Sequence, residues 1–208
     1  MGAPALWGLV LLGYFLGSIP FGYLLVRARS GRDIRYMGSG NIGATNVART
    51  SGWSTGIATL FLDAAKGFLA VWLIGRFSDG NIRFMVFAGL AAMIGHVFPA
   101  WLRFAGGKGV ATALGVFLGI SWQAVAVAVA VFLLVAFFWR YISLASISAA
   151  AALPLLVYLL YAPGHAPPAA VSFCTLLACI LVIIKHRDNI ERLMAGTEPR
   201  FEMGRKKS

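Results

Sequence analysis

The chain has 208 residues, of which 60% are hydrophobic and 12% are charged, and its mean hydropathy is +0.81. Soluble domains carry about 25% charged residues, so this composition excludes an ordinary soluble protein and indicates an all-α polytopic membrane protein. The formal net charge of +11 does not indicate nucleic-acid binding, because the Lys and Arg residues gather in short segments between apolar stretches.

The apolar stretches predict one domain, residues 1–208, built as a bundle of seven transmembrane helices. No Lys or Arg precedes Arg27, so the first stretch lacks the positive start of a secretory signal and is expected to be retained. At about 1.5 Å per residue, region 110–138 is too long for one crossing, and we expect two short helices broken near Ser121. The predicted spans are 5–26, 53–75, 84–102, 110–120, 124–138, 144–162 and 169–184.

Basic residues predict how this bundle is oriented. With seven spans, segments 27–52, 103–109 and 139–143 and the tail from 185 lie on one side, and together they hold 15 of the 18 Lys and Arg residues. Lys and Arg are enriched on the cytoplasmic side of membrane proteins. We therefore expect the amino terminus outside and the carboxyl terminus in the cytoplasm.

The loop 38–46, with the sequence GSGNIGATN, separates the first two spans. Glycines let successive backbone N–H groups turn toward an anion, the Ser, Thr and Asn side chains add neutral donors, and Arg35 and Arg49 flank the loop with positive charge. It is not a nucleotide P-loop, because no Gly-Lys-Ser/Thr follows. The pattern favours a phosphate cradle over the alternative of a flexible connector.

A second anion site is predicted at Gly106-Gly-Lys-Gly109, where backbone N–H groups and a helix dipole accompany Lys108 at the start of the fourth span. The alternative is that Lys108 serves only the topology and that the glycines form a tight turn.

Two pairs of side chains on the same side are each three residues apart. Ser143 and Ser146 share a helix face near its start, where they either contact a ligand or cap the helix. His186 and Asn189 follow the last span and are close enough to reach one ligand. All these clusters fall on the predicted cytoplasmic face.

Other polar residues fit structural roles. Asp63 and Lys66, three apart within a span, are expected to form a buried ion pair, and His96 to be a hydrogen-bonded core residue. Cys174 and Cys179 are expected to be core thiols. The sequence has no paired-carboxylate motif for magnesium and no His/Cys cluster for zinc, so we expect no metal and no other cofactor.

Several motifs in chain order resemble the bacterial acyl-phosphate:glycerol-3-phosphate acyltransferase family, an integral membrane group that begins phospholipid synthesis. They are GSIPFGYLL at 17–25, GSGNIGATN at 38–46 with Arg49, LDAAKG at 62–67, GHVFP at 95–99, GGKGVAT at 106–112 and HRDNIERLMAGTE at 186–198. The resemblance covers nearly the whole chain. It implies a multi-pass protein of the bacterial plasma (inner) membrane with its active site on the cytoplasmic face.

The reaction that the resemblance implies moves a fatty acyl group from acyl phosphate to the 1-hydroxyl of sn-glycerol 3-phosphate, giving lysophosphatidate and phosphate. The expected partners are these two substrates and the lipid bilayer, with no nucleic acid, and a monomer is compatible with the chain. Catalysis is expected to be metal-independent and substrate-assisted. The alternative is a membrane carrier for phosphate or a small organic anion, which is disfavoured because the outer half offers little polarity beyond Asp63 and Lys66.

The resemblance also divides the site residues between two phosphates. The acyl phosphate would be cradled by Ser39, Asn41, Gly43, Thr45 and Asn46, and the glycerol phosphate would be lined by Arg49, Lys108, Ser146, His186 and Asn189. The further substrate-binding candidates, assigned to neither phosphate, are Gly40, Ala44, Gly107 and Ser143. Of these, the catalytic candidates are Lys108, Ser146, His186 and Asn189.

Overall fold

The computed structural model describes residues 2–161 and 164–201. Within those ranges the chain forms ten α-helices and two short 3-10 helices. Residue 162, at the end of the predicted span 144–162, and residues 202–208 of the basic tail lie outside the described ranges.

The first predicted span, 5–26, is two helices rather than one. α1 covers Ala3–Ser18 and α2 covers Phe21–Ser30, with the break at Ile19 and Pro20. Proline cannot donate a backbone hydrogen bond and its ring clashes with the carbonyl one turn earlier, so the helix breaks at this point. The segment that follows holds a 3-10 helix at Ile34–Tyr36 and α3 at Ala44–Ser51.

α4 covers Trp53–Phe77 and α5 covers Ile82–Val97. The predicted span 84–102 lies within the candidate membrane span Ile82–Leu102, of which α5 forms the first part. Phe98 precedes Pro99, and a residue before proline is disfavoured in the helical region, so α5 stops before the pair. A 3-10 helix at Ala100–Leu102 follows.

The remaining helices fold back on one another. α6 covers Val110–Leu118 and α7 covers Trp122–Trp139, so the expected break falls at residues 119–121. α8 covers Ile142–Leu160 and α9 covers Ala169–Lys185. α10, Arg187–Met194, is bent by 56° from α9.

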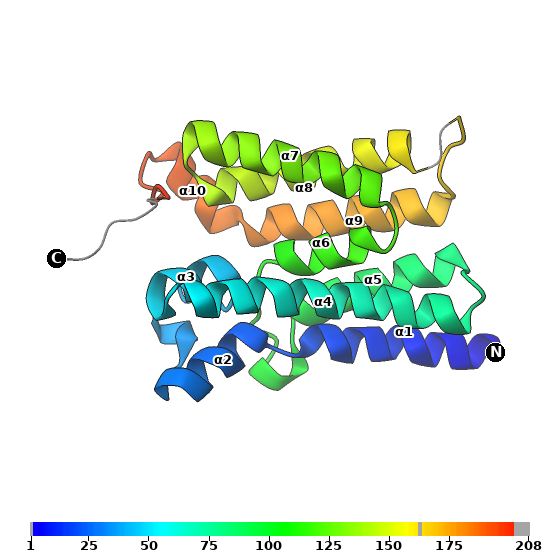
Figure 1. Cartoon of the computed structure of the whole chain (residues 1–208), viewed down its shortest axis with the longest axis horizontal. Helices are drawn as coiled ribbons and strands as arrows, with labels where there is room; N and C mark the ends of the chain where they lie inside the picture. The colour runs from blue at the N-terminus through cyan, green and yellow to red at the C-terminus, as the bar shows by residue number, and fades with distance from the viewer. Residues whose placement is uncertain (1, 162–163, 202–208) are drawn as a thin grey trace.

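Figure 1 shows the long helices running back and forth between the two ends of the bundle. α2, α3 and α10 lie at one end, and the amino terminus lies at the other. α1 packs on α5 and α4, α4 on α6, and α7 on α8, which in turn packs on α9. Segments 27–52, 139–143 and 185–201 thus collect at that end, and Lys108 of segment 103–109 reaches it through its contact with Asn189 of α10.

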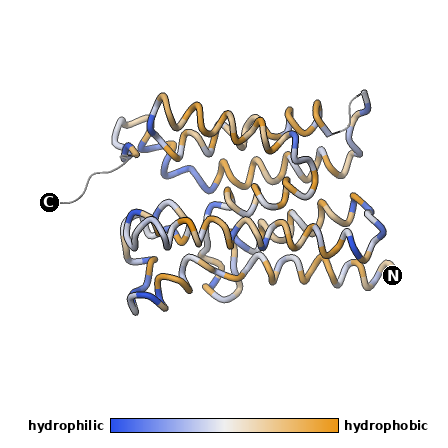
Figure 2. The backbone as a smooth tube through the Cα atoms, in the orientation of Figure 1, coloured by the Kyte–Doolittle hydropathy of each residue, from blue (hydrophilic) through white to orange (hydrophobic). Residues whose placement is uncertain are grey.

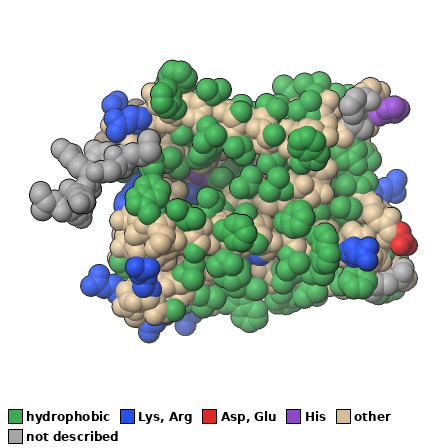
Figure 3. Space-filling model, in the orientation of Figure 1, with side chains coloured by type: hydrophobic (Ala, Val, Ile, Leu, Met, Phe, Trp, Pro, Cys, Tyr) green, Lys and Arg blue, Asp and Glu red, His purple; other side chains and the backbone are tan. Residues whose placement is uncertain are grey.

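The surface is apolar along the middle of the bundle. Figure 2 shows hydrophobic segments along the helices, and Figure 3 shows hydrophobic side chains covering most of the middle of the visible face. Five helices in the described residues are long and apolar enough to cross a membrane, or six if the bent pair of α9 and α10 is one span. α6, with nine residues, does not meet that length.

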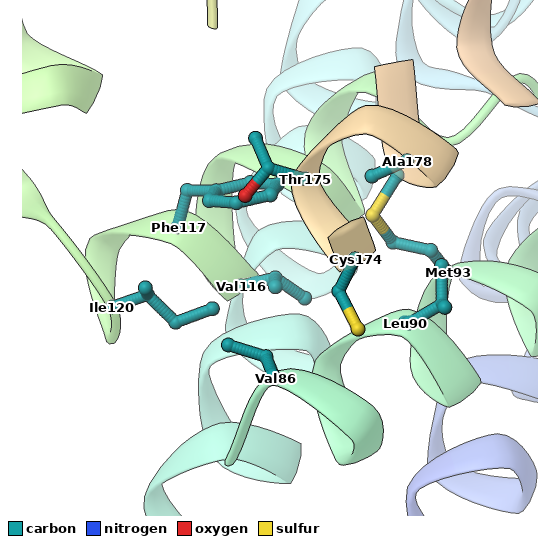
Figure 4. A pocket seen from close by; sticks show the side chains of 9 residues that line it. All are labelled: Val86, Leu90, Met93, Val116, Phe117, Ile120, Cys174, Thr175 and Ala178. Carbon is teal, nitrogen blue, oxygen red and sulfur yellow. The ribbon is translucent and has the colours of Figure 1, made fainter. Parts of the chain in front are cut away.

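The interior away from α2, α3 and α10 is apolar as well. A cavity of about 10 Å³ lies between α5, α6 and α9, lined by Val86, Val116, Phe117 and Cys174 among others (Figure 4). The Thr175 hydroxyl at its wall already donates to the Val171 carbonyl at 2.7 Å. This cavity is a packing defect of an apolar core and offers no polar site.

Candidate active site

A group of polar side chains from four segments meets where α6, α8 and α10 begin. The Lys108 ammonium donates to Oδ1 of Asn189. Nδ2 of Asn189 donates to Oε1 of Glu198 at 2.7 Å, and the Ser143 hydroxyl donates to the same oxygen at 2.6 Å. The structure therefore brings Lys108, Ser143 and Asn189 together, as their place on one face suggested.

Glu198 was not among the site residues proposed from sequence. Its side chain is 7% exposed, and its Oε2 accepts from Nε of Arg192 at 2.7 Å. Burial raises the pKa of Glu198, but the hydrogen bonds from Ser143, Asn189 and Arg192 outweigh that effect and hold the pKa below its ordinary value. An anion site is expected to hold cations and neutral donors, so a carboxylate was not predicted there, although the motif HRDNIERLMAGTE at 186–198 ends on Glu198.

His186 joins α9 to α10 and is 3% exposed. Its Nδ1 lies 2.8 Å from the carbonyl oxygen of Val182. A carbonyl only accepts, so Nδ1 carries the proton, and Nε2 of the neutral ring is an acceptor. Burial, the largest cause, and the nearby charge of Lys108 together lower the pKa of His186 to about 4, against the opposing effect of the hydrogen bond to Val182. At neutral pH this ring is uncharged and cannot serve as a cation for phosphate.

Lys108 lies in the loop between α5 and α6. Burial lowers its pKa, as does the charge of Arg192, while Glu198 opposes the shift. The N–H groups of Gly106 and Gly107 donate to the carbonyls of Val97 and His96, at 3.2 and 3.1 Å. These two groups are thus not free to form the anion nest predicted for the loop, because the α5 end lacks its own partners and takes them.

The first loop is held together from within. Asn46 is buried, its Oδ1 accepts from the Ser39 N–H at 2.9 Å, and its Nδ2 donates to the carbonyls of Met37 and Asn41 at 2.9 and 2.8 Å. Oδ1 of Asn41 accepts from the Gly43 N–H at 2.7 Å. Asn41 and Asn46 therefore fix the loop, and the N–H groups of Ser39 and Gly43, expected to face an anion, are already used.

Other parts of the loop are accessible. Ser39, Thr45 and Arg49 are exposed, and Ala44 and Thr45 supply the first turn of α3, where backbone N–H groups lack helical partners. The Gly40 N–H donates to the Met37 carbonyl at 3.0 Å and so does not face a ligand. The donors left for a ligand are thus the exposed side chains and the first turn of α3.

Ser146 stands apart from the polar group. It is buried, and its hydroxyl donates to the Ile142 carbonyl of its own helix at 2.8 Å. Ser143 rather than Ser146 joins the hydrogen bonds around Glu198. The resemblance gave Ser146 rather than Ser143 as the catalytic candidate. Both serines lie on the same helix face, and the sequence around them is less distinctive than the other motifs.

Two contacts connect the first loop to the rest of the site. Ile42 and Val47 pack with Leu102, which precedes the Lys108 loop, in one buried apolar cluster. Phe201, three residues after Glu198, places its ring 5.6 Å from that of Trp53 at the start of α4. The loop and the Lys108 group therefore belong to the same end of the molecule (Figure 1).

The apolar helical bundle is that of an integral membrane protein. At one of its ends, a buried group of hydrogen-bond donors with positive charge nearby suits an anionic ligand. The profile of the glycerol-3-phosphate acyltransferase family matches residues 7–196. The chain belongs to this family, and it is a multi-pass membrane protein. Among its described residues, no group of three His, Cys, Asp or Glu side chains is arranged to hold a metal.

Relatives agree over nearly the whole length. The glycerol-3-phosphate acyltransferase of Mesorhizobium japonicum is 51% identical over 195 residues, which are 92% of this chain and 95% of that protein. The protein of the same name from Geotalea daltonii is 51% identical over 194 residues, which are 93% of this chain and 96% of that one.

Two crystal structures share the fold. PlsY (YgiH), an integral membrane glycerol 3-phosphate acyltransferase, matches in its glycerol 3-phosphate form with a TM-score of 0.88 and 40% identity, covering 95% of this chain and 96% of that chain. Its lysophosphatidic acid form matches with a TM-score of 0.84 and 39% identity over the same shares.

Proposed function

We propose that this chain transfers a fatty acyl group from acyl phosphate to the 1-hydroxyl of sn-glycerol 3-phosphate, giving lysophosphatidate and phosphate, as the first step of bacterial phospholipid synthesis. Membership of the glycerol-3-phosphate acyltransferase family supports this function. The observation that carries it is the meeting of Lys108, Asn189 and the buried neutral His186 at one end of the bundle. A cation, an amide and an imidazole acceptor suit a molecule with both a phosphate and a hydroxyl.

The chain acts as a single domain, residues 1–208, in the bacterial plasma (inner) membrane. Its seven spans count the short α6 as the fourth, with the amino terminus outside and the carboxyl terminus and the site in the cytoplasm. The alternating directions of α1 and of α4 to α9, and the basic segments gathered at one end, support this topology. The chain works as a monomer.

Two anions are held by two parts of the site. The acyl phosphate binds at the first loop through Ser39, Thr45 and the first turn of α3, with Arg49 supplying charge. The rest of that loop, Gly40, Asn41, Gly43, Ala44 and Asn46, shapes the cradle. The glycerol phosphate binds at Lys108, with Gly107, Ser143, His186 and Asn189 around it. Ser146, whose hydroxyl is bonded to its own helix, supports α8 rather than the phosphate.

Glu198 sets the orientation of Asn189. The carboxylate takes the Asn189 amide NH₂, so the amide oxygen is left to face the Lys108 ammonium. The ammonium keeps two further N–H groups for a phosphate. Glu198 thus holds Lys108 indirectly, at the cost of placing a negative charge near an anion site.

The chemistry needs positioning more than acid catalysis, because an acyl phosphate is a mixed anhydride with a stabilised leaving group. The glycerol hydroxyl oxygen attacks the acyl carbon, the new ester bond forms, and the bond between the acyl carbon and the phosphate oxygen breaks. The cations hold two anions that would otherwise repel and stabilise the developing charge.

The proton of the hydroxyl passes to the leaving phosphate. Nε2 of His186 accepts the hydroxyl hydrogen bond and orients the nucleophile, but a pKa of about 4 makes this ring too weak a base to keep the proton. Phosphate has a second pKa of about 6 and takes it instead. The reaction is therefore substrate-assisted.

Purified protein in detergent tests this function. It is incubated with acyl phosphate, glycerol 3-phosphate and a chelator, and released phosphate and lysophosphatidate are measured. Equal amounts of both products, only when both substrates are present, are expected. Phosphate uptake by liposomes carrying the protein, without lysophosphatidate synthesis, would instead identify the anion carrier, which the apolar core around Val116 and Phe117 does not favour.

A further inference from the structure

Three buried polar side chains lie in the bundle beside the substrate-binding groups but are not among them. Asp63 and Lys66 of α4 and His96 of α5 are 2%, 4% and 3% exposed. Nζ of Lys66 lies 2.7 Å from Oδ1 of Asp63, which confirms the predicted ion pair. Nδ1 of His96 faces the same oxygen at 3.6 Å, beyond hydrogen-bond distance, so the buried ring lies against the carboxylate of the pair.

Charges at membrane depth are costly, and such groups usually serve a purpose beyond stability. Neither Asp63, Lys66 nor His96 belongs to the substrate-binding set, and the mechanism does not use them. Their backbone and side-chain contacts, however, reach both parts of the site.

The first contact is with the break between α1 and α2. Nζ of Lys66 donates to the carbonyl oxygen of Ile19 at 2.7 Å, and it lies 5.6 Å from the centre of the Phe21 ring. The same carbonyl also accepts from the Phe21 N–H at 3.1 Å. Because α2 leads directly into the segment that carries the first loop, Lys66 fixes the direction in which that segment leaves the bundle.

The second contact is with the loop that carries Lys108. The His96 carbonyl accepts from the Gly107 N–H at 3.1 Å. The His96 ring lies so close to Gly107 that a Cβ there would overlap its Nε2. The imidazole is thus held between the Asp63 carboxylate and the backbone next to Lys108, so a shift of the ring shifts the Lys108 loop.

The α4 turn that bears Asp63 and Lys66 is also rigidly placed. A Cβ at Gly115 of α6 would overlap the carbonyl of Ala64, so the two backbones touch at this turn. Close packing of this kind transmits small displacements rather than absorbing them. α6 begins two residues after Lys108. The α4 turn that contacts α6 at Gly115 therefore also helps to fix the position at which the Lys108 loop ends.

We propose that Asp63, Lys66 and His96 are positioning residues for acyl transfer: together they hold the Ile19 break and the Gly107 backbone in the register that aims the first loop and Lys108 at one pair of phosphates. They do not touch substrate. The inference rests on the proposed function. It differs from a purely stabilising role because changes in this group would alter catalysis without a matching loss of stability.

A double-mutant cycle with Lys108 tests this assignment. The paired change Asp63→Asn with Lys66→Met removes both charges without leaving one unpaired, and it is made in wild type and in Lys108→Ala. The route through His96 and Gly107 depends on Lys108, whereas the route through Ile19 does not. The pair is therefore expected to lower kcat/KM for glycerol 3-phosphate by about 10-fold in wild type and by less than about 3-fold in Lys108→Ala, where only the Ile19 route is left. Losses that multiply, about 10-fold in both backgrounds, would overturn the proposal.

The control is Thr59→Val on the same helix. Thr59 is fully buried one turn before Asp63, and its hydroxyl donates only to the Thr55 carbonyl of α4. We expect activity within about 2-fold of wild type for this near-isosteric change. Losses that follow the melting temperature across all variants, the control included, would also overturn the proposal and leave the group purely structural.

Should the paired variant not fold, His96→Gln decides the question by the same cycle, because it keeps the Asp63 and Lys66 pair and removes only the ring beside Gly107. The expected and contrary results are those given for the pair. An inactive wild-type protein would reject the proposed function, whereas an active wild type with multiplicative losses would reject only the positioning role.

Discussion

The two polar regions at the site end are built in different ways. In the first loop, Asn46 bonds groups that lie at most nine residues away along the chain. Around Glu198, by contrast, Lys108 and Asn189 are 81 residues apart, and Ser143 and Glu198 are 55 apart. The loop therefore has a local scaffold of its own, while the Lys108 group exists only when α6, α8 and α10 are in place.

This difference predicts different consequences of mutation. A change inside the loop should alter its local order and leave the bundle intact. A change in the Lys108 group should alter substrate binding directly, because its members are the polar groups themselves rather than their support.

Lys108→Ala should have the largest effect. Loss of a charge-assisted contact to phosphate costs ~1.5 to 3 kcal/mol, which lowers kcat/KM for glycerol 3-phosphate by roughly 10- to 200-fold. The steady-state rate of lysophosphatidate formation measures it. Arg103→Ala, which removes an exposed charge from the same loop, is the matched control and should stay near wild type. Equal activity of the two variants would remove Lys108 from the site.

The second prediction concerns acid stability through His186. The pKa of His186 is about 4 in the folded chain and 6.5 when unperturbed, so between these pH values the unfolded chain binds a proton that the folded chain does not. Stability is therefore complete above pH 6.5 and is lost as the pH falls toward 4, by about 2 kcal/mol at pH 5. Melting temperatures at pH 7 and pH 5 should differ by more in wild type than in His186→Gln.

The same variant separates a ligand from a base. We expect His186→Gln to raise KM for glycerol 3-phosphate, with the pH profile of kcat unchanged between about pH 5.5 and 8, since a group with a pKa of about 4 does not titrate there. A variant that binds normally, has lost the chemical step and shows a new pH profile would contradict substrate-assisted proton transfer.

The third prediction tests the scaffold of the loop. Asn46→Asp keeps the acceptor for the Ser39 N–H but replaces the two donated hydrogen bonds to Met37 and Asn41 with repulsion between oxygens. We expect this to destabilise the folded loop by about 1 to 2 kcal/mol, which lowers activity by roughly 5- to 30-fold. Tryptic cleavage after Arg49 should become faster while the melting temperature of the bundle stays within a few degrees. A large drop in melting temperature would show that the loop is not an independent scaffold.

How far the sequence could predict these regions follows from the range of the contacts. The break between α6 and α7 follows from helix length against bilayer thickness, and the Asp63 and Lys66 pair from their spacing on one helix turn. Both depend on information within a short stretch of chain. The break at Pro20 is of the same kind, because a proline interrupts a helix locally.

The missed and misplaced roles depend on contacts that residue type and spacing alone do not reveal. Nothing near Glu198 in the chain shows that its carboxylate receives Asn189 and Ser143, because those contacts form only after α8 and α10 pack. Asn46 was predicted as a ligand from its residue type, yet its amide is spent on the loop backbone, and only the folded loop reveals that competition.

The smallest effect separates Ser143 and Ser146, two serines on the same face of α8. Ser143→Ala removes a hydrogen bond to Glu198 and should lower kcat/KM by about 2- to 10-fold, equivalent to ~0.5 to 1.5 kcal/mol, because Arg192 and Asn189 still hold the carboxylate. Ser146→Ala loses only a bond to its own helix, so activity should remain within about 2-fold of wild type. Both variants remove one hydroxyl group, and the two sites are about one helix turn apart, so each variant is the control for the other. A larger loss in Ser146→Ala would place the substrate against the α8 face that bears Ser146 and move the glycerol phosphate away from Glu198.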